Sequence, residues 1–194
     1  MALTDVQICN LAIDSLKGQR IVALGESTAN GTRFAQWYAQ DRDELLSRYP
    51  WTFAIKRASL AAHATAPAYE YDLAFPVPGD CLSPWTLEDW RYADAKSPLE
   101  NHHGLRCILS NLGAPLRLRY IAQITNTGLF HPLFVKALVK LLAYDTCFAI
   151  TGSMGAREQI MGEFREILSA AMESDAIAGG DAEFLTDDWL SARV

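Results

Sequence analysis

The residues of this sequence that would be most useful for catalysis are two adjacent carboxylates, Glu88 and Asp89, with Asp80 and Asp94 nearby in the chain. Hydrolysis of a glycan needs one carboxyl group to protonate the leaving group and a second to activate water or attack the sugar. The spacing of Glu88 and Asp89 does not distinguish them from turn residues. We therefore assign no catalytic residue, expect the protein not to be an enzyme, and keep glycan hydrolysis as the alternative function.

Histidine and cysteine residues could bind a metal, but their spacing argues against a site. His102 and His103 are neighbours, and successive side chains of an extended strand face opposite ways. The sequence has no G-x-S-x-G, P-loop or Rossmann glycine pattern, so we expect no cofactor and no metal. The cysteines form no C-x-x-C motif, which favours free buried thiols in a reducing compartment over disulfides: Cys9, Cys81, Cys107 and Cys147.

Charge is unevenly placed along the chain. The net charge is -6, from 17 basic and 23 acidic residues, so a dominant basic surface for nucleic acid is not expected. Between Glu158 and Asp188 there are nine acidic residues and one base, Arg165. Arginines concentrate instead at 106, 117 and 119. The acidic run is either a solvated helix face or one side of a polarised subunit that meets like subunits or a channel.

The most apolar long segment is 131–150, and its composition predicts a buried helix around which the other elements pack. Apolar side chains occupy most of the helix circumference, and Lys136 and Lys140 leave a narrow edge that reaches water. Pro132 suits the first helical turn, and Thr151-Gly152 provides a stop. Two lysines and an aspartate inside the segment, without basic or aromatic flanks, argue against a membrane span.

Three further helices are expected. Thr4 and Gln7 have the spacing of a capping box, so the first helix begins there and ends at Lys17-Gly18. The second covers about 32–49 and is terminated by Pro50, and the fourth covers about 153–178 before a double glycine.

The segment between the second and third helices is rich in proline and aromatic residues, which excludes a helix and favours short strands. Strands are expected after Phe53 and at 69–75, 82–87 and 90–92. The runs 105–109 and 116–121 are predicted to pair as a hairpin, because Leu116, Leu118 and Tyr120 alternate with Arg117 and Arg119. This alternation predicts one buried face and one basic exposed face.

The expected fold class is α+β: a four-helix bundle with a β-rich insertion between the second and third helices, and an extended C-terminal arm. The bundle would comprise residues 1–50 and 123–180, the insertion 51–122, and the arm 181–194. The N-terminal sequence has no apolar stretch typical of a signal peptide.

Dispersed motifs resemble those of the tail tubular protein A, or head–tail adaptor (connector), family of short-tailed bacteriophages. Four blocks are similar to that family's first helix, second helix, strand start and third helix with its lead-in, and a fifth to its C-terminal arm. No similarity is evident between Thr86 and Gly104. The blocks are NLAIDSLKGQRI (10–21), YAQDRDELLSRYPWTFAIKRASLA (38–61), LAFPVPGDCL (73–82), LRYIAQITNTGLFHPLFVKALVKLLAYDTCFAITGS (118–153) and DDWLSARV (187–194).

The resemblance implies a structural virion protein that is not an enzyme. It implies an oligomeric ring, a dodecamer, that joins the portal protein to the tail nozzle protein, with tail fibres as a further partner. The ring would extend the channel through which genomic DNA passes during ejection, without sequence-specific binding and without a membrane. The expected location is the portal vertex of the virion, after assembly in the host cytoplasm.

The resemblance also places the C-terminal arm on the portal. Its apolar residues follow a double glycine, and fourteen residues are too few to fold alone, so these groups must dock onto the helices or onto another chain. We expect docking on the portal, because aromatic and arginine anchors within a polar rim are typical of interface hot spots. The expected portal-binding residues are Phe184, Leu185, Asp188, Trp189, Leu190 and Arg193.

Overall fold

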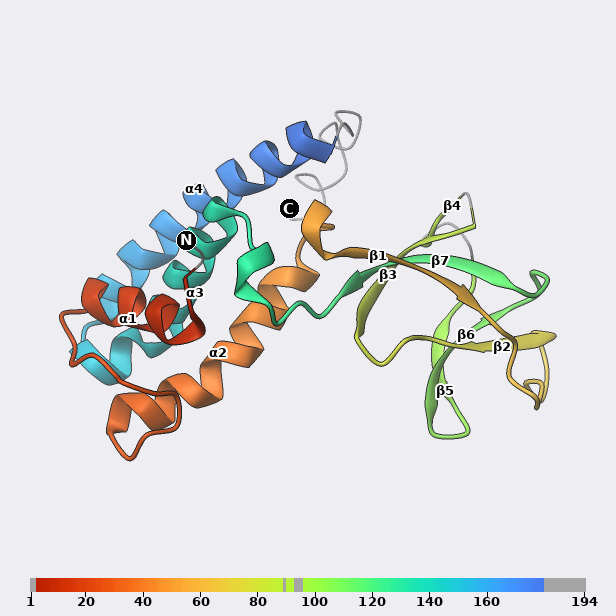
Figure 1. The fold of residues 1–194 in the computed structure, drawn as a ribbon, viewed down its shortest axis with the longest axis horizontal. Coiled ribbons are helices and arrows are strands. Elements are labelled where there is room, and N and C mark those ends of the chain that lie inside the picture. The colour runs from red at the N-terminus through yellow and green to blue at the C-terminus, as the bar shows by residue number, and fades with distance from the viewer. Residues whose placement is uncertain (1–2, 89, 93–95, 180–194) are drawn as a thin grey trace. The chain divides into compact units, whose positions relative to one another are not determined.

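The computed structural model describes residues 3–88, 90–92 and 96–179. The fold is mixed α+β, with four helices and two small antiparallel sheets in the described part of the chain (Figure 1). The chain separates into two compact units: a helical unit, up to Phe53 and again from Ile124, and a β unit, Ala54–Gln123. The expected arm, 181–194, lies outside the described residues.

The first two helices begin at caps that their sequences provide. Helix α1 (Asp5–Ser15) has the predicted capping box, in which Thr4 Oγ1 accepts a hydrogen bond from the Gln7 backbone N–H and the Gln7 side chain accepts one from the Thr4 backbone N–H. Helix α2 (Ala29–Ser47) begins three residues earlier than expected, because the Thr28 hydroxyl accepts a hydrogen bond from the Gly31 backbone N–H.

Helices α3 (Pro132–Thr151) and α4 (Met154–Gly179) follow each other through a short turn (Figure 1). Gly152 lies at φ 67°, a left-handed conformation that suits glycine and ends α3 as predicted. The prediction of a buried helix is confirmed, since α3 contacts α1, α2 and α4. No helix among the described residues combines the length and apolar character needed to cross a membrane.

Aromatic rings fill one end of the helical unit. Trp51 is fully buried and meets Phe134 edge to face, with ring centroids 5.2 Å apart. Its indole Nε1–H donates to the Leu45 carbonyl at 3.0 Å, so the buried polar atom is satisfied. Phe53 and Phe130 complete the cluster around Phe134. Two short 3₁₀ turns, Thr52–Ala54 and Thr127–Leu129, precede and follow the β unit in sequence.

The β unit contains a four-stranded and a three-stranded sheet (Figure 1). In the first, the order is β1-β7-β3-β4, and in the second β2-β6-β5. All neighbouring strands are antiparallel. The strands are β1 (Ile55–Leu60), β2 (Leu73–Pro76), β3 (Cys81–Leu87), β4 (Trp90–Arg91), β5 (Leu99–His102), β6 (Leu105–Ser110) and β7 (Leu116–Ala122).

The predicted hairpin between 105–109 and 116–121 is wrong. Strand β6 pairs with β2 on one edge and β5 on the other, whereas β7 pairs with β1 and β3. Each strand has two hydrogen-bonding edges, so neither has an edge left for the other. The alternation in β7 was predicted correctly: Leu116, Leu118 and Tyr120 are buried, Arg117 is exposed and Arg119 is half-buried.

Candidate functional site

The exposed face of the four-stranded sheet carries the most distinctive arrangement of charged side chains in the described chain. Residues directly opposite in an antiparallel ladder lie on the same face. Arg57 of β1 is opposite Arg119 of β7, Arg119 is opposite Thr86 of β3, and Thr86 is opposite Arg91 of β4. We call Arg57, Arg119 and Arg91 the arginine row. It crosses the whole sheet from one edge strand to the other.

Neighbouring side chains shape the row. The Arg119 guanidinium lies over the Trp85 ring, 4.2 Å from its centroid, a cation–π contact that fixes the guanidinium and covers one face of the indole. Trp85 reaches this face because the β3–β7 register shifts between Pro84 and Thr86, the sign of a β-bulge. Arg57 is exposed and has no ion-pair partner among the described residues.

Arg117 lies two residues from Arg119 on the same face of β7, and its side chain is 68% exposed. The Glu88 carboxylate accepts hydrogen bonds from the Arg117 backbone N–H and Nε, both at 2.7 Å. Both bonds lower the pKa of Glu88, and the bond from the Arg117 backbone N–H has the larger effect. A general acid needs a raised pKa, so Glu88 is poorly suited to protonate a glycosidic oxygen. Asp89, the other half of the pair, lies outside the described residues.

Arg106 was expected beside Arg117 and Arg119, and this was wrong. It belongs to β6 in the other sheet, and its guanidinium Nη1 donates to the Cys81 carbonyl at 2.8 Å. Arg57 and Arg91 were not predicted as members of the positive face. The alternation around Arg57 was visible in the sequence, but its partner strand was not.

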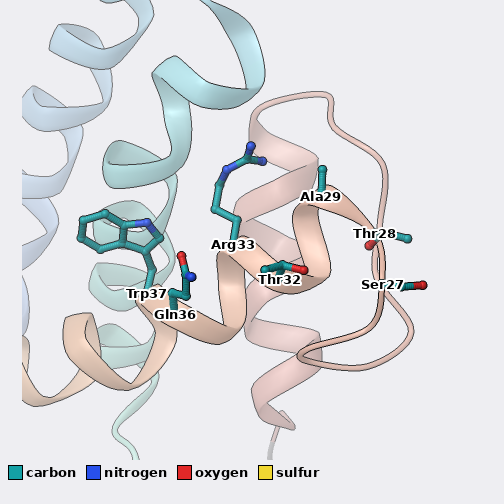
Figure 2. A pocket seen from close by; sticks show the side chains of 7 residues that line it. All are labelled: Ser27, Thr28, Ala29, Thr32, Arg33, Gln36 and Trp37. Atoms are coloured by element: carbon teal, nitrogen blue, oxygen red, sulfur yellow. The ribbon is translucent and has the colours of Figure 1, made fainter.

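A second polar surface lies at the start of α2. Figure 2 shows an open depression lined by side chains from the preceding loop and from the first turns of the helix. Thr28 is engaged as the helix cap, and Arg33 donates to the Asn30 side chain at 2.8 Å. The lining contains no carboxylate, cysteine or histidine, so it offers contacts rather than acid–base or metal chemistry: Ser27, Thr28, Ala29, Thr32, Arg33, Gln36 and Trp37.

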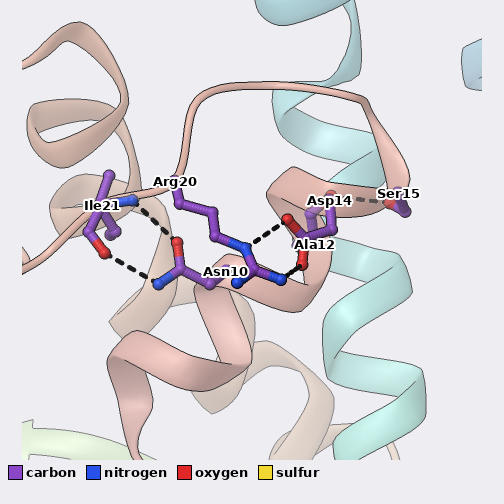
Figure 3. Close-up of polar contacts among 6 residues, drawn as sticks. All are labelled: Asn10, Ala12, Asp14, Ser15, Arg20 and Ile21. Carbon is purple, nitrogen blue, oxygen red and sulfur yellow. Dashed lines mark hydrogen bonds and ion pairs between the residues drawn. The ribbon is translucent and has the colours of Figure 1, made fainter.

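Side-chain hydrogen bonds hold the loop before this depression on α1 (Figure 3). The Asn10 amide bonds the Ile21 backbone in both directions, donating to its carbonyl and accepting from its N–H, each at 2.9 Å. Arg20 makes a two-pronged ion pair with Asp14 at 2.6 and 2.7 Å. The ion pair between Arg20 and Asp14 is exposed and stabilises the fold little. The Asn10 hydrogen bonds satisfy the backbone N–H and carbonyl of Ile21, so they hold the loop in place although it pairs with no strand or helix backbone there.

Histidine rings converge in a way that the sequence did not indicate. His63, from the segment after β1, stacks on His103 at 5.5 Å and meets His102 at 5.1 Å, centroid to centroid. His102 Nε2 lies 2.9 Å from the Thr65 carbonyl oxygen, so one nitrogen is engaged in the loop. Within the described residues, no group of three or more His, Cys, Asp or Glu side chains is arranged to hold a metal ion.

The cysteines are free and buried, as predicted. Burial raises the pKa of the Cys9 thiol to about 12 and that of Cys81 to about 11, which makes both poor nucleophiles.

One carboxyl group is buried without a partner. Asp41 of α2 is fully buried, and neither of its oxygens has a hydrogen-bond partner in the described structure. Burial raises the pKa of Asp41 to about 8, and the charges of Asp145 and Glu44 add to the effect. A perturbed pKa is typical of functional groups, but Asp41 is sealed from solvent and cannot touch a substrate in this conformation.

No protein-family model matches this sequence, and no curated protein matches it.

Proposed function

We propose that this chain is a structural virion protein, the subunit of a head–tail adaptor ring that joins a phage portal to the tail nozzle and extends the DNA channel. The observation that carries the proposal is that the sequence blocks similar to the adaptor family fall on helices and strands of the kinds, and in the order, that the resemblance implies. The block 10–21 covers the end of α1, and the block 38–61 covers the second half of α2 and the whole of β1. The block 73–82 contains β2, and the block 118–153 contains most of β7 and the whole of α3.

The finer architecture belongs to this proposal. In it, the four helices form one bundle, and the β unit is an insertion between α2 and α3. Support comes from the order of the elements in the described part of the chain: α1 and α2 precede β1 to β7, and α3 and α4 follow them. A packed bundle gives a ring subunit a rigid body, while a separate β unit supplies a second surface for contacts with other chains.

The charge distribution also fits a subunit that assembles. Exposed carboxylates lie along α4 and arginines across one face of the β unit, so each copy presents surfaces of opposite sign. Unlike surfaces that attract each other are suited to head-to-tail contacts, which form a ring when the rotation from copy to copy closes. In the alternative, glycan hydrolysis, Glu88 would be the acid, and its ion pair with Arg117 gives that role no support.

The portal would be met by the C-terminal arm, through the residues named above, which lie outside the described part of the chain. Trp189 is the proposed anchor, so Trp189→Ala should weaken portal binding by at least about 2 kcal/mol.

Electron microscopy of the protein mixed with portal rings tests the proposal directly. We expect a ring of this protein, a dodecamer, capping one end of each portal. Portals that remain bare at saturating concentrations of a folded protein would refute the adaptor role.

A further inference from the structure

The arginine row presents an extended positive surface of defined length. It crosses the three gaps between four strands, each about 4.8 Å wide, so it covers roughly 14 Å. Arg57 and Arg91 at its two ends are exposed, while Arg119 in the middle is held over Trp85. Guanidinium groups bind carboxylates through two parallel hydrogen bonds, so the row is suited to a partner with several carboxylates in line.

The exposed side of α4 has that character. Glu166 and Glu173 are seven residues apart, which places them on one face of the helix and about 10 Å apart along its axis. Neither has an ion-pair partner among the described residues. Ile177 continues the face and is 74% exposed. The positions between and around the glutamates hold small side chains that would let a sheet approach closely: Gly162, Ser169 and Ala170.

We infer that the arginine row of one copy binds the Glu166–Glu173 face of α4 in a neighbouring copy of this chain. The inference rests on the proposed function, since it names the surfaces through which ring subunits meet. The two surfaces differ, so the contact is heterologous and repeats from copy to copy until the ring closes. Two carboxylates about 10 Å apart fit a row of roughly 14 Å, because arginine side chains are long enough to adjust.

A second copy suits this surface better than a nucleic acid does. Single-stranded nucleic acids bind through bases stacked on open aromatic faces, and the Arg119 guanidinium already covers one face of Trp85. The net charge of -6 repels phosphate at long range. The acidic face of α4 is present in every copy, at the same concentration as the row.

Charge exchange between variants of the full-length protein tests the inference. The first variant carries Arg57→Glu and Arg91→Glu, and the second carries Glu166→Arg and Glu173→Arg. Sedimentation velocity at about 0.1 M salt follows association up to roughly 100 μM protein. We expect the wild type to form oligomers that high salt dissociates. Each variant alone should associate at least about tenfold more weakly.

An equimolar mixture of the two variants should associate again. In the mixture, each reversed row meets a reversed helix, and each wild-type row meets a wild-type helix. This recovery also shows that both variants are folded, and thermal melts of each provide a second check. Lys17→Glu, just after α1, is the matched control, since it makes the same charge change as Arg57→Glu at an exposed position that belongs to neither surface, and it should leave association unchanged.

Several results would overturn the inference. They are a wild type that stays monomeric throughout, folded variants that associate like the wild type, and a mixture that fails to recover. A fourth is a labelled single-stranded DNA that binds the wild type but not the first variant while self-association is unchanged, which would make the row a nucleic-acid surface. If rings cap the portal regardless of these charges, only the inference fails; if copies associate through them but leave portals bare, only the proposed function fails.

Discussion

Replacing Asp41 by Asn should stabilise the helical unit, and the gain should grow as the pH rises. The Asp41 carboxyl is fully buried in α2 and has no hydrogen-bond partner in the described structure. Burial raises its pKa from the ordinary 3.8 to about 8. In the unfolded chain the same carboxyl ionises near pH 4, so above that pH the folded state must hold a proton that the unfolded state releases.

The magnitude follows from this difference in pKa. Below about pH 4 both states are protonated, and Asp41 costs the fold no ionisation energy. The cost then grows by about 1.36 kcal/mol for each pH unit until the pH reaches the folded pKa. It amounts to about 1–2 kcal/mol at pH 5 and roughly 5 kcal/mol at pH 8. A protonated carboxyl and an amide both bury unpartnered polar atoms, so that part of the energy nearly cancels in the substitution.

Urea unfolding at pH 5, 6, 7 and 8 measures the effect, because the carboxyl groups with lowered pKa have finished titrating in this range. The difference in unfolding free energy between Asp41→Asn and the wild type should rise steadily with pH. Glu166→Gln is the control, since Glu166 is exposed, has no ion-pair partner among the described residues and is not among the charges that raise the pKa of Asp41. A gain that is the same at every pH, or a loss of stability at pH 8, would refute the reasoning.

Four further outcomes follow from the fold and the sequence. Leu138→Ala should cost about 2–5 kcal/mol of stability and exposed Lys136→Ala under about 1, and equal losses in thermal melts would contradict the burial of α3. Buried Asp175 accepts hydrogen bonds from the Thr52 N–H and hydroxyl at 2.9 and 2.8 Å, so Asp175→Ala should cost about 2–3 kcal/mol in urea unfolding, more than Thr52→Val. Deleting 181–194 should leave the melting temperature nearly unchanged while portal binding is lost; a fall of many degrees would make the arm part of the core. Gel shifts at ~0.15 M salt should show no retention of duplex DNA, and micromolar affinity would count against a channel role.

The helices were predictable because their signals are local. Thr4 and Gln7 are three residues apart and meet within one turn, and the apolar composition of α3 is complete within twenty residues. The start of α2 was misplaced because Thr28 lies in a polar connector, where several hydroxyl and amide side chains compete as caps.

The candidate site was only half predictable, because strand partners are set by contacts far apart in the sequence. The alternation of apolar and charged residues predicted which face of β7 carries Arg117 and Arg119, since the side chains of a strand alternate regardless of its partner. The alternation did not predict that Arg57 lies opposite Arg119, which is sixty-two residues away in the chain. The same limitation hid the approach of His63 to His102.

The β unit leaves and rejoins the helical part of the chain through adjacent strands. Ile55, near its beginning, is the direct partner of Ile121, near its end, and paired residues in such ladders lie about 5 Å apart. A gap of that width can be closed by a turn of a few residues. A gene that replaces the β unit by such a turn, or by another domain with closely spaced ends, should therefore leave the connection between α2 and α3 intact. The sequences of the two units can then change at different rates.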